Sequence, residues 1–180
     1  MDKLPICIDL DGTLIFEDVT LWSVKHYISK NPFNIFKIIF WLLSGRPNMK
    51  KQLALKTESE FDASEFTYNK KLLAFIAEKK SEGHKIFLAT ASDEILANKV
   101  ADFLDIFDGV FASNPAVNLR AEAKANALVT IFGEKGFIYA GNSIHDVPVW
   151  RRSAESILVN PTPDALKMME GQEYILMEEK

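Results

Sequence analysis

Short apolar runs alternate with longer amphipathic segments along most of the chain. The apolar runs have the length of buried strands and lie at residues 6–8, 85–92, 109–112, 136–140 and 156–159. Apolar residues at three- and four-residue spacing indicate helices at 69–80, 94–104, 124–131, 147–154 and after Pro163. Strands that alternate with helices in this order predict an α/β domain with a mostly parallel sheet. We therefore expect a three-layer, Rossmann-like fold.

The region between the first two strands breaks this alternation. It shows little β-type patterning and instead predicts three helices, at residues 21–29, 32–43 and 47–57, separated by proline and glycine breaks. Roughly fifty residues are too many for a plain crossover connection. We expect a helical cap at residues 17–68, inserted into a core domain formed by 1–16 and 69–180.

The middle helix of this cap is apolar on nearly every side, interrupted only by Asn34 and Lys37. Such a helix is normally buried, so we expect it to pack within the cap, against the body or in a dimer interface. At about 18 Å it is too short to cross a bilayer. The alternative is contact with anionic lipid, or with the apolar tail of a lipid-linked phosphate.

Charge is distributed unevenly along the 180-residue chain, whose net charge is −4. Between residues 19 and 60, Glu58 and Glu60 are outnumbered by seven basic residues: Lys25, Lys30, Lys37, Arg46, Lys50, Lys51 and Lys56. A basic segment on an acidic body suggests an anionic partner, although solvated helix faces also explain single lysines.

The cysteine content and the length of the apolar runs indicate the cellular compartment of the protein. The single cysteine, Cys7, excludes an intramolecular disulfide, and no apolar run reaches the roughly 20 residues of a membrane span. The first strand begins too early for a cleavable leader to precede it. We expect a cytoplasmic protein with no nucleic-acid partner, and peripheral contact with the inner face of a membrane remains the open alternative. The oligomeric state is left open.

Two carboxylates follow the first strand directly. Residues 6–14, Ile-Cys-Ile-Asp-Leu-Asp-Gly-Thr-Leu, place Asp9 and Asp11 at the strand's carboxyl end, and Gly12 permits a sharp turn there. In open α/β sheets, ligands bind at this edge. One carboxylate can attack phosphorus while a second protonates the leaving oxygen. Taken alone, the two acids fit equally well a buried strand that ends in an Asp-Gly turn.

Later segments bring further candidate groups to strand and helix ends. Thr90 closes the second long apolar run, where its hydroxyl could bind a phosphoryl oxygen, and Ser92 or Asp93 could cap the next helix. Lys124 stands at the start of a helix. Residues 141–146, Gly-Asn-Ser-Ile-His-Asp, follow another strand, and we expect His145 to be a solvated loop residue rather than a substrate contact. Singly, each of these residues is an ordinary structural feature.

The string from Asp9 to Leu14 resembles the first motif of the haloacid dehalogenase-like hydrolase superfamily. The resemblance implies that Asp9 is the nucleophile, Asp11 the general acid and base, and Thr13 a turn-stabilising residue. It also implies that Thr90 and Ala91 bind the phosphoryl group as the second motif. Lys124 matches the third motif, which is a lysine that balances charge and binds substrate.

The fourth motif departs from the family pattern, because Asn142 stands where the family typically has an aspartate. The resemblance implies Mg²⁺ as cofactor, held by Asp9, the main-chain oxygen of Asp11 and Asn142. Asp146 would act on the metal through water or orient Lys124. An amide oxygen still suits Mg²⁺, with one charge fewer among the ligands.

The cap segment and the spelling Tyr-Ala-Gly-Asn-Ser at 139–143 also resemble the hydrolase domain that precedes a membrane aromatic-polyprenyltransferase domain in some bacterial fusion proteins. We expect a Mg²⁺-dependent phosphomonoester hydrolase that forms an aspartyl-phosphate on a small-molecule or lipid-linked substrate. Two alternatives stay open: a phosphoryl transferase or mutase, and a regulatory domain that binds a phosphorylated ligand without turnover, which Asn142 favours.

Overall fold

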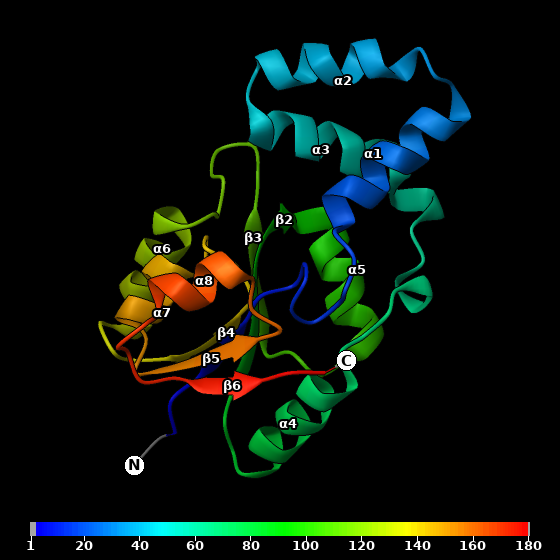
Figure 1. The fold of residues 1–180 in the computed structure, drawn as a ribbon. Coiled ribbons are helices and arrows are strands. Elements are labelled where there is room, and N and C mark those ends of the chain that lie inside the picture. Colours follow the sequence, from blue (N-terminus) through cyan, green and yellow to red (C-terminus); the bar gives the residue numbers. More distant parts are fainter. Residues whose placement is uncertain (1–2, 180) are drawn as a thin grey trace.

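A computed structural model, described for residues 3–179, has a six-stranded sheet at its centre (Figure 1). The strands are β1 (Ile6–Ile8), β2 (Ile86–Asp93), β3 (Gly109–Ser113), β4 (Ile138–Gly141), β5 (Glu155–Val159) and β6 (Ile175–Met177). Their order is β3-β2-β1-β4-β5-β6, and every neighbouring pair is parallel. The predicted α/β class is confirmed. The short strand β6 was not predicted, because only three residues form it and two of them are exposed at the sheet edge.

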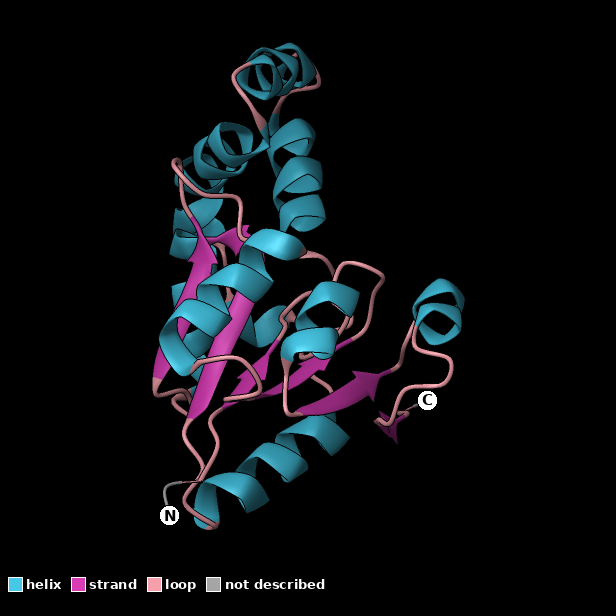
Figure 2. Cartoon of the chain, turned by 90° about the vertical axis from the view of Figure 1, so that its left-hand side faces the viewer, coloured by secondary structure: helices cyan, strands magenta, loops and turns pink. Residues whose placement is uncertain are grey.

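Helices cover both faces of the sheet, which gives the predicted three layers (Figure 2). Ile6 and Ile8 of β1 face a core shared with α4 (Lys70–Ser81) and α5 (Glu94–Leu104). Cys7, between them, faces the opposite core, formed with α6 (Glu122–Phe132), α7 (Val147–Arg152) and α8 (Pro163–Met168). This alternation follows from the two-residue period of a strand. Both faces of β1 are therefore apolar, and the first polar side chain after it is that of Asp9.

Three further helices stand above the carboxyl edge of the sheet: α1 (Val19–Lys30), α2 (Asn34–Leu43) and α3 (Arg46–Thr57). The Asp18 side chain caps α1 by accepting from the main-chain nitrogen of Leu21 at 2.7 Å. Two short 3₁₀ helices, η1 (Glu58–Glu60) and η2 (Ala63–Glu65), lead back to the core. We propose residues 17–68 as the cap. No helix formed by residues 3–179 is long and apolar enough to span a membrane.

The expected burial of the middle cap helix within the cap or against the body is wrong. Of the residues in α2, only Asn34 and Ile38 are buried, and Leu43 is 81% exposed. The interior of the cap is small, since its buried apolar cluster consists of Tyr27, Ile38 and Leu53. With α1 and α3 on one side only, the cap covers a single face of α2, and its other apolar side chains point outward.

Candidate active site

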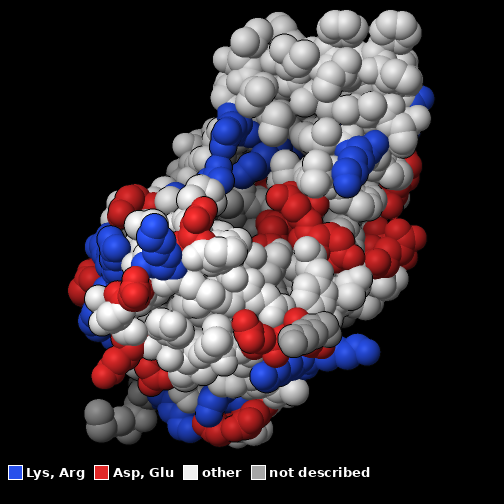
Figure 3. All heavy atoms as spheres, in the orientation of Figure 1, with Lys and Arg blue, Asp and Glu red and all other residues white. Residues whose placement is uncertain are grey.

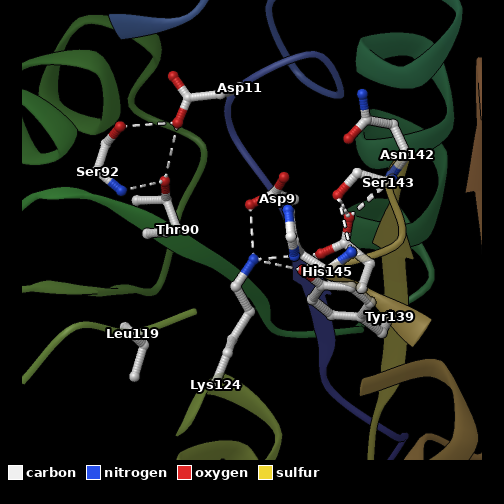
Figure 4. A network of polar contacts seen from close by, with 12 residues as sticks. Asp9, Asp11, Thr90, Ser92, Leu119, Lys124, Tyr139, Asn142, Ser143 and His145 are labelled. Atoms are coloured by element: carbon white, nitrogen blue, oxygen red, sulfur yellow. Dashed lines mark hydrogen bonds and ion pairs between the residues drawn. The ribbon is translucent and has the colours of Figure 1, made fainter. Parts of the chain in front are cut away.

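Asp9 and Lys124 form a buried ion pair at the carboxyl edge of the sheet. Asp9 directly follows β1, and Lys124 is the third residue of α6. Lys124 Nζ donates to Asp9 Oδ1 at 2.7 Å, to the Tyr139 hydroxyl at 2.7 Å and to Asp146 Oδ1 at 3.3 Å (Figure 4). The lysine is only 3% exposed. Two predicted site residues from distant parts of the chain are thus in direct contact.

Asp146 fixes both this lysine and the loop after β4. Its Oδ1 also accepts from the Tyr139 hydroxyl at 2.6 Å. Its Oδ2 accepts from the main-chain nitrogens of Asn142 and Ser143, at 3.1 and 3.0 Å, and from the Ser143 hydroxyl at 3.1 Å. A side chain on Gly141 would place its Cβ 2.6 Å from Asp146 Cγ, so this close packing requires glycine. Both carboxylate oxygens of Asp146 are therefore already hydrogen-bonded within the protein.

The charged groups shift one another's ionisation. Burial raises the pKa of Asp9 to about 7, and Asp146 and Asp11 add to this rise while Lys124 opposes it. Burial also disfavours the charge on Asp146, yet Lys124 and the donors from Tyr139, Ser143 and Asn142 hold its pKa below the ordinary value. For Lys124, the two carboxylates outweigh burial and raise the pKa. The lysine and Asp146 therefore stay charged, while Asp9 sits close to its titration point at neutral pH.

The Asp11 side chain turns away from Asp9, toward the cap (Figure 4). Its Oδ1 accepts from the main-chain nitrogen of Val19, the first residue of α1, at 2.7 Å. Its Oδ2 accepts from the hydroxyls of Ser92 and Thr90, at 2.7 and 3.3 Å. Burial raises the pKa of this carboxyl, and the charge of Asp18 adds to the rise. A raised pKa suits a carboxylic acid that must donate a proton.

The end of β2 brings three consecutive residues to the site. The Thr90 hydroxyl, fully buried, accepts from the main-chain nitrogen of Ser92 at 2.9 Å. The Ala91 carbonyl accepts from Lys50 Nζ at 2.6 Å and from the Ser113 hydroxyl at 2.7 Å. Asp93 caps α5 through the nitrogen of Ile95, so Ser92 is free to contact Asp11. Ser92 was considered only as a helix cap, and its place in the site was missed.

The turn after Asp11 depends on Gly12. Its φ of +73° lies in the left-handed region, and a Cβ there would meet Asn142 Nδ2 at 2.3 Å. The Asn142 side chain therefore lies directly against the loop that carries the two acids. Thr13 is fully buried, and its hydroxyl has no hydrogen-bond partner within residues 3–179. Its main-chain nitrogen donates to the Leu10 carbonyl within the turn at 3.2 Å.

A cavity of about 630 Å³ lies over these residues, between core and cap. Its floor holds the acids and Lys124, and its walls include Leu42, Arg46, Met49, Lys50, Arg120 and His145. Burial lowers the pKa of Lys50, and the charge of Asp11 opposes this shift. His145 lies half-buried in the loop after β4, where it lines the cavity and contacts the Arg120 guanidinium through Nε2. Arg46, Lys50 and Arg120 were not predicted as site residues, since single lysines and arginines in helices and loops carry no sequence signal of their own.

The groups on the floor fit a divalent cation. Asp9 and Asp146 share one buried lysine, and Asp11 also lines the cavity, so the acids on the floor outnumber its one cation. In the part of the chain that the structure describes, no hydrogen bond engages Asp9 Oδ2 or the Asn142 amide oxygen. No group of three His, Cys, Asp or Glu side chains within residues 3–179 could hold a metal ion, so amide or main-chain oxygens and water would have to complete its shell.

The protein has a three-layer α/β fold, with helices α1, α2 and α3 above an acidic pocket at the carboxyl edge of its sheet. Solved structures with a similar fold include a phosphoserine phosphatase with bound substrate, with a TM-score of 0.68 at 18% identity over 99% of this chain and 94% of that one. A haloacid dehalogenase-like hydrolase from Streptococcus pneumoniae gives 0.64 at 18% identity over 96% and 93%. A protein of unknown function from Bordetella pertussis gives 0.75 at 12% identity over 98% and 99%. These likenesses show that the chain shares the fold of these proteins.

Comparison at the level of sequence adds one relative. The chain is 34% identical over 157 residues to an uncharacterized protein, y4nM, of Sinorhizobium fredii. The match covers 87% of this chain and 30% of that relative, so the chain spans about a third of the relative's length. No family model matches the chain.

Proposed function

We propose that the chain hydrolyses phosphate monoesters through an aspartyl-phosphate formed on Asp9. The observation that carries this proposal is the buried contact between Lys124 Nζ and Asp9 Oδ1 at the floor of the cavity. The lysine holds one carboxylate oxygen and leaves Oδ2 for attack on phosphorus. The solved structure of a phospho-aspartyl intermediate analogue of phosphoserine phosphatase shares the fold, with a TM-score of 0.68 at 18% identity. That likeness supports the same chemistry here.

In the first step, Asp9 Oδ2 forms a bond to phosphorus as the bond from phosphorus to the ester oxygen breaks. Asp11 gives its proton to the departing alkoxide, and its raised pKa favours that role. In the second step, Asp11 takes a proton from water, which attacks the same phosphorus and releases phosphate from Asp9. Lys124 and the Thr90 hydroxyl stabilise the phosphoryl oxygens, where fixed charges and dipoles are most effective.

We propose that Mg²⁺ is held by Asp9, Asn142 and the main-chain oxygen of Asp11. When bound, it supplies positive charge that neutralises the phosphoryl oxygens. Asp146 acts on the metal only indirectly, because both of its oxygens are occupied by Lys124, Tyr139 and the loop. Of its two implied roles, we propose that Asp146 orients Lys124.

The walls of the cavity point to the kind of substrate. Arg46 and Lys50 from α3 and Arg120 from the core loop place three cationic side chains around the phosphate site. Leu42 and Met49 add apolar surface beside them. We propose a phosphorylated small molecule, free or lipid-linked, that carries a second anionic group.

Release of inorganic phosphate tests this function. Purified protein is incubated with an aryl phosphate and with a panel of phosphate monoesters that includes prenyl phosphates, with Mg²⁺ and with EDTA. We expect turnover that requires Mg²⁺ and that disappears in Asp9→Asn. Release of phosphate by Asp9→Asn at the wild-type rate would contradict the proposal.

Asn142 favours one alternative, which is a domain that binds a phosphorylated ligand without turning it over. Its amide reduces the charge available to hold a metal by one relative to a carboxylate. Saturable binding of a phosphate ester by calorimetry, with no phosphate released from any member of the panel, would establish that alternative.

A further inference from the structure

The outer face of α2 is an apolar surface that nothing in the described chain covers. Phe33, Phe36, Phe40 and Leu43 follow one another at spacings of three and four residues and are 74%, 65%, 68% and 81% exposed. Ile35, Ile39 and Leu42 extend this surface along the flank of the helix and are also exposed. Figure 3 shows the outer end of the cap without charged atoms on the face in view. Six large apolar side chains on one short helix, with Phe33 just before it, form a contiguous exposed patch of the kind that marks an interaction site.

The three α-helices of the cap, α1 to α3, carry charged residues of one sign. Residues 19–57 include seven lysines and arginines and no aspartate or glutamate, so all 25 acidic residues lie elsewhere in the chain. Lys30 is paired with Glu60, and Lys51 with Glu94. The exposed side chains of Lys25, Lys37, Arg46 and Lys56 have no ion-pair partner within residues 3–179. Lys37 lies on α2 itself, among the exposed apolar residues.

We propose that α2 docks the cap onto an anionic lipid bilayer. Its exposed apolar face would enter the interface between headgroups and acyl chains, and the unpaired cations would contact the headgroups. The ten residues of α2 make a helix of about 15 Å, which lies along a membrane surface rather than across it. A second copy of the chain fits this surface less well, because pairing α2 with α2 brings together two caps whose helices carry only positive charge.

The docking surface is continuous with the cavity. Leu42 belongs to the exposed flank of α2 and also lines the cavity, and Arg46 and Met49 lie in the next helix beside it. A cap docked in this way would hold the cavity close to the lipid headgroups. Delivery of a lipid-linked phosphate to Asp9 is a consequence that rests on the proposed function, whereas the docking itself does not.

Co-sedimentation with vesicles tests the docking. The protein is mixed with vesicles of phosphatidylcholine and phosphatidylglycerol, and with phosphatidylcholine vesicles as the reference, at low and high salt. We expect binding to the anionic vesicles that weakens as salt rises. The double variant Phe36→Ser, Phe40→Ser should lose about tenfold or more in affinity, and Lys37→Glu at least about fivefold.

A matched control separates docking from general surface apolarity and from catalysis. Ile131 on α6 is 54% exposed, so Ile131→Ser removes a comparable apolar group far from the cap in sequence and should bind vesicles as the wild type does. Thermal melting confirms that each variant is folded. Turnover of a water-soluble aryl phosphate should be the same in the Phe36, Phe40 variant as in the wild type, so loss of docking and loss of the proposed activity are told apart.

Three outcomes would overturn the proposal. The first is equal binding to neutral and anionic vesicles, and the second is binding that the Phe36, Phe40 variant retains in full. The third is a wild-type dimer in sedimentation velocity that this variant dissociates, with no vesicle binding. In the third case, a second copy of the chain covers α2.

Discussion

The Asp11 carboxylate accepts a 2.7 Å hydrogen bond from the main-chain nitrogen of Val19, the first residue of the first cap helix. The proposed acid is therefore bound to the start of the cap, where the partial positive charge of a helix N-terminus favours its ionised form. To protonate a leaving oxygen, this side chain has to turn from Val19 toward the substrate. The position of α1 and the availability of the acid are thereby coupled.

Removal of the Asp11 acid should distinguish formation of the aspartyl-phosphate from its hydrolysis. In Asp11→Asn the side-chain oxygen can still accept from Val19, so the fold and cap should persist. We expect steady-state turnover to fall by roughly 10²- to 10⁴-fold, the usual contribution of general acid–base catalysis. Rapid-mixing kinetics with a nitrophenyl phosphate, whose leaving group needs no proton, should still show a burst of nitrophenolate. An alkyl phosphate, whose alkoxide must be protonated to leave, should show no burst of released alcohol. If Asp11→Asn slowed the first step equally for both esters, Asp11 would not be the acid.

Asp9 should lower the stability of the metal-free protein at neutral pH. An acid whose pKa is higher in the folded than in the unfolded state lowers stability as pH rises through that interval. Burial raises the pKa of Asp9 to about 7, so stability should fall between about pH 4 and pH 7. In EDTA, Asp9→Asn should raise the free energy of unfolding at pH 8 by roughly 1 to 3 kcal/mol, and little at pH 4.

Urea unfolding at the two pH values measures this difference. Asp102→Asn is the matched control, because Asp102 is an exposed aspartate on α5 and should show no such dependence on pH. If Asp9→Asn raised the free energy of unfolding equally at pH 4 and pH 8, the charge of Asp9 would not be the cause of the increase.

Asn142→Asp should have opposite effects with and without metal. The added carboxylate would raise the ligand charge, so the Mg²⁺ concentration that gives half-maximal activity should fall, by roughly tenfold. In EDTA the same variant should melt at a lower temperature, because a fourth acid would join Asp9, Asp11 and Asp146. Metal titration of turnover and thermal melting in EDTA measure the two effects. If the titration is unchanged, Asn142 does not hold the metal.

Lys50 should discriminate among substrates. Its Nζ is held beside the phosphate site by the Ala91 carbonyl and the Asn118 side chain. Lys50→Ala should raise KM for esters that carry a second anionic group, by about tenfold, and change KM little for an aryl phosphate. Lys51→Ala is the control, since the neighbouring lysine pairs with Glu94 instead. If Lys50→Ala changed KM equally for all substrates, Lys50 would have a structural role.

The strands and the proposed chemical groups could be predicted to different extents. Asp9 and Lys124 were predicted because the residues around them resemble the first and third motifs of a known family, whereas each residue alone is an ordinary structural feature. Tyr139 and Ser92 were not. The Ser92–Asp11 contact exists only once β1 and β2 are paired, and the Tyr139–Asp146 contact depends on the conformation of the loop after β4. Lys50 reaches Ala91 from 41 positions away in sequence, and no periodicity marks such a contact.

The exposure of α2 could not be predicted from the sequence, for a different reason. Its composition indicates a buried helix, and nothing local distinguishes a helix that the fold buries from one that a partner outside the fold would cover. The number of helices packed around it decides the outcome, and the cap supplies only α1 and α3. This is a tertiary property, which the sequence of residues 32–43 does not contain.

The most direct test of the central claim is mass spectrometry of the protein quenched in acid during turnover of an aryl phosphate. Asp11→Asn provides the sample in which the second step is slow and the intermediate accumulates. We expect one phosphoryl group on the peptide that contains Asp9, sensitive to hydroxylamine as an acyl phosphate is, and none in the Asp9→Asn, Asp11→Asn double variant. A phosphoryl group on another residue, or turnover in which Asp9 is never modified, would contradict it.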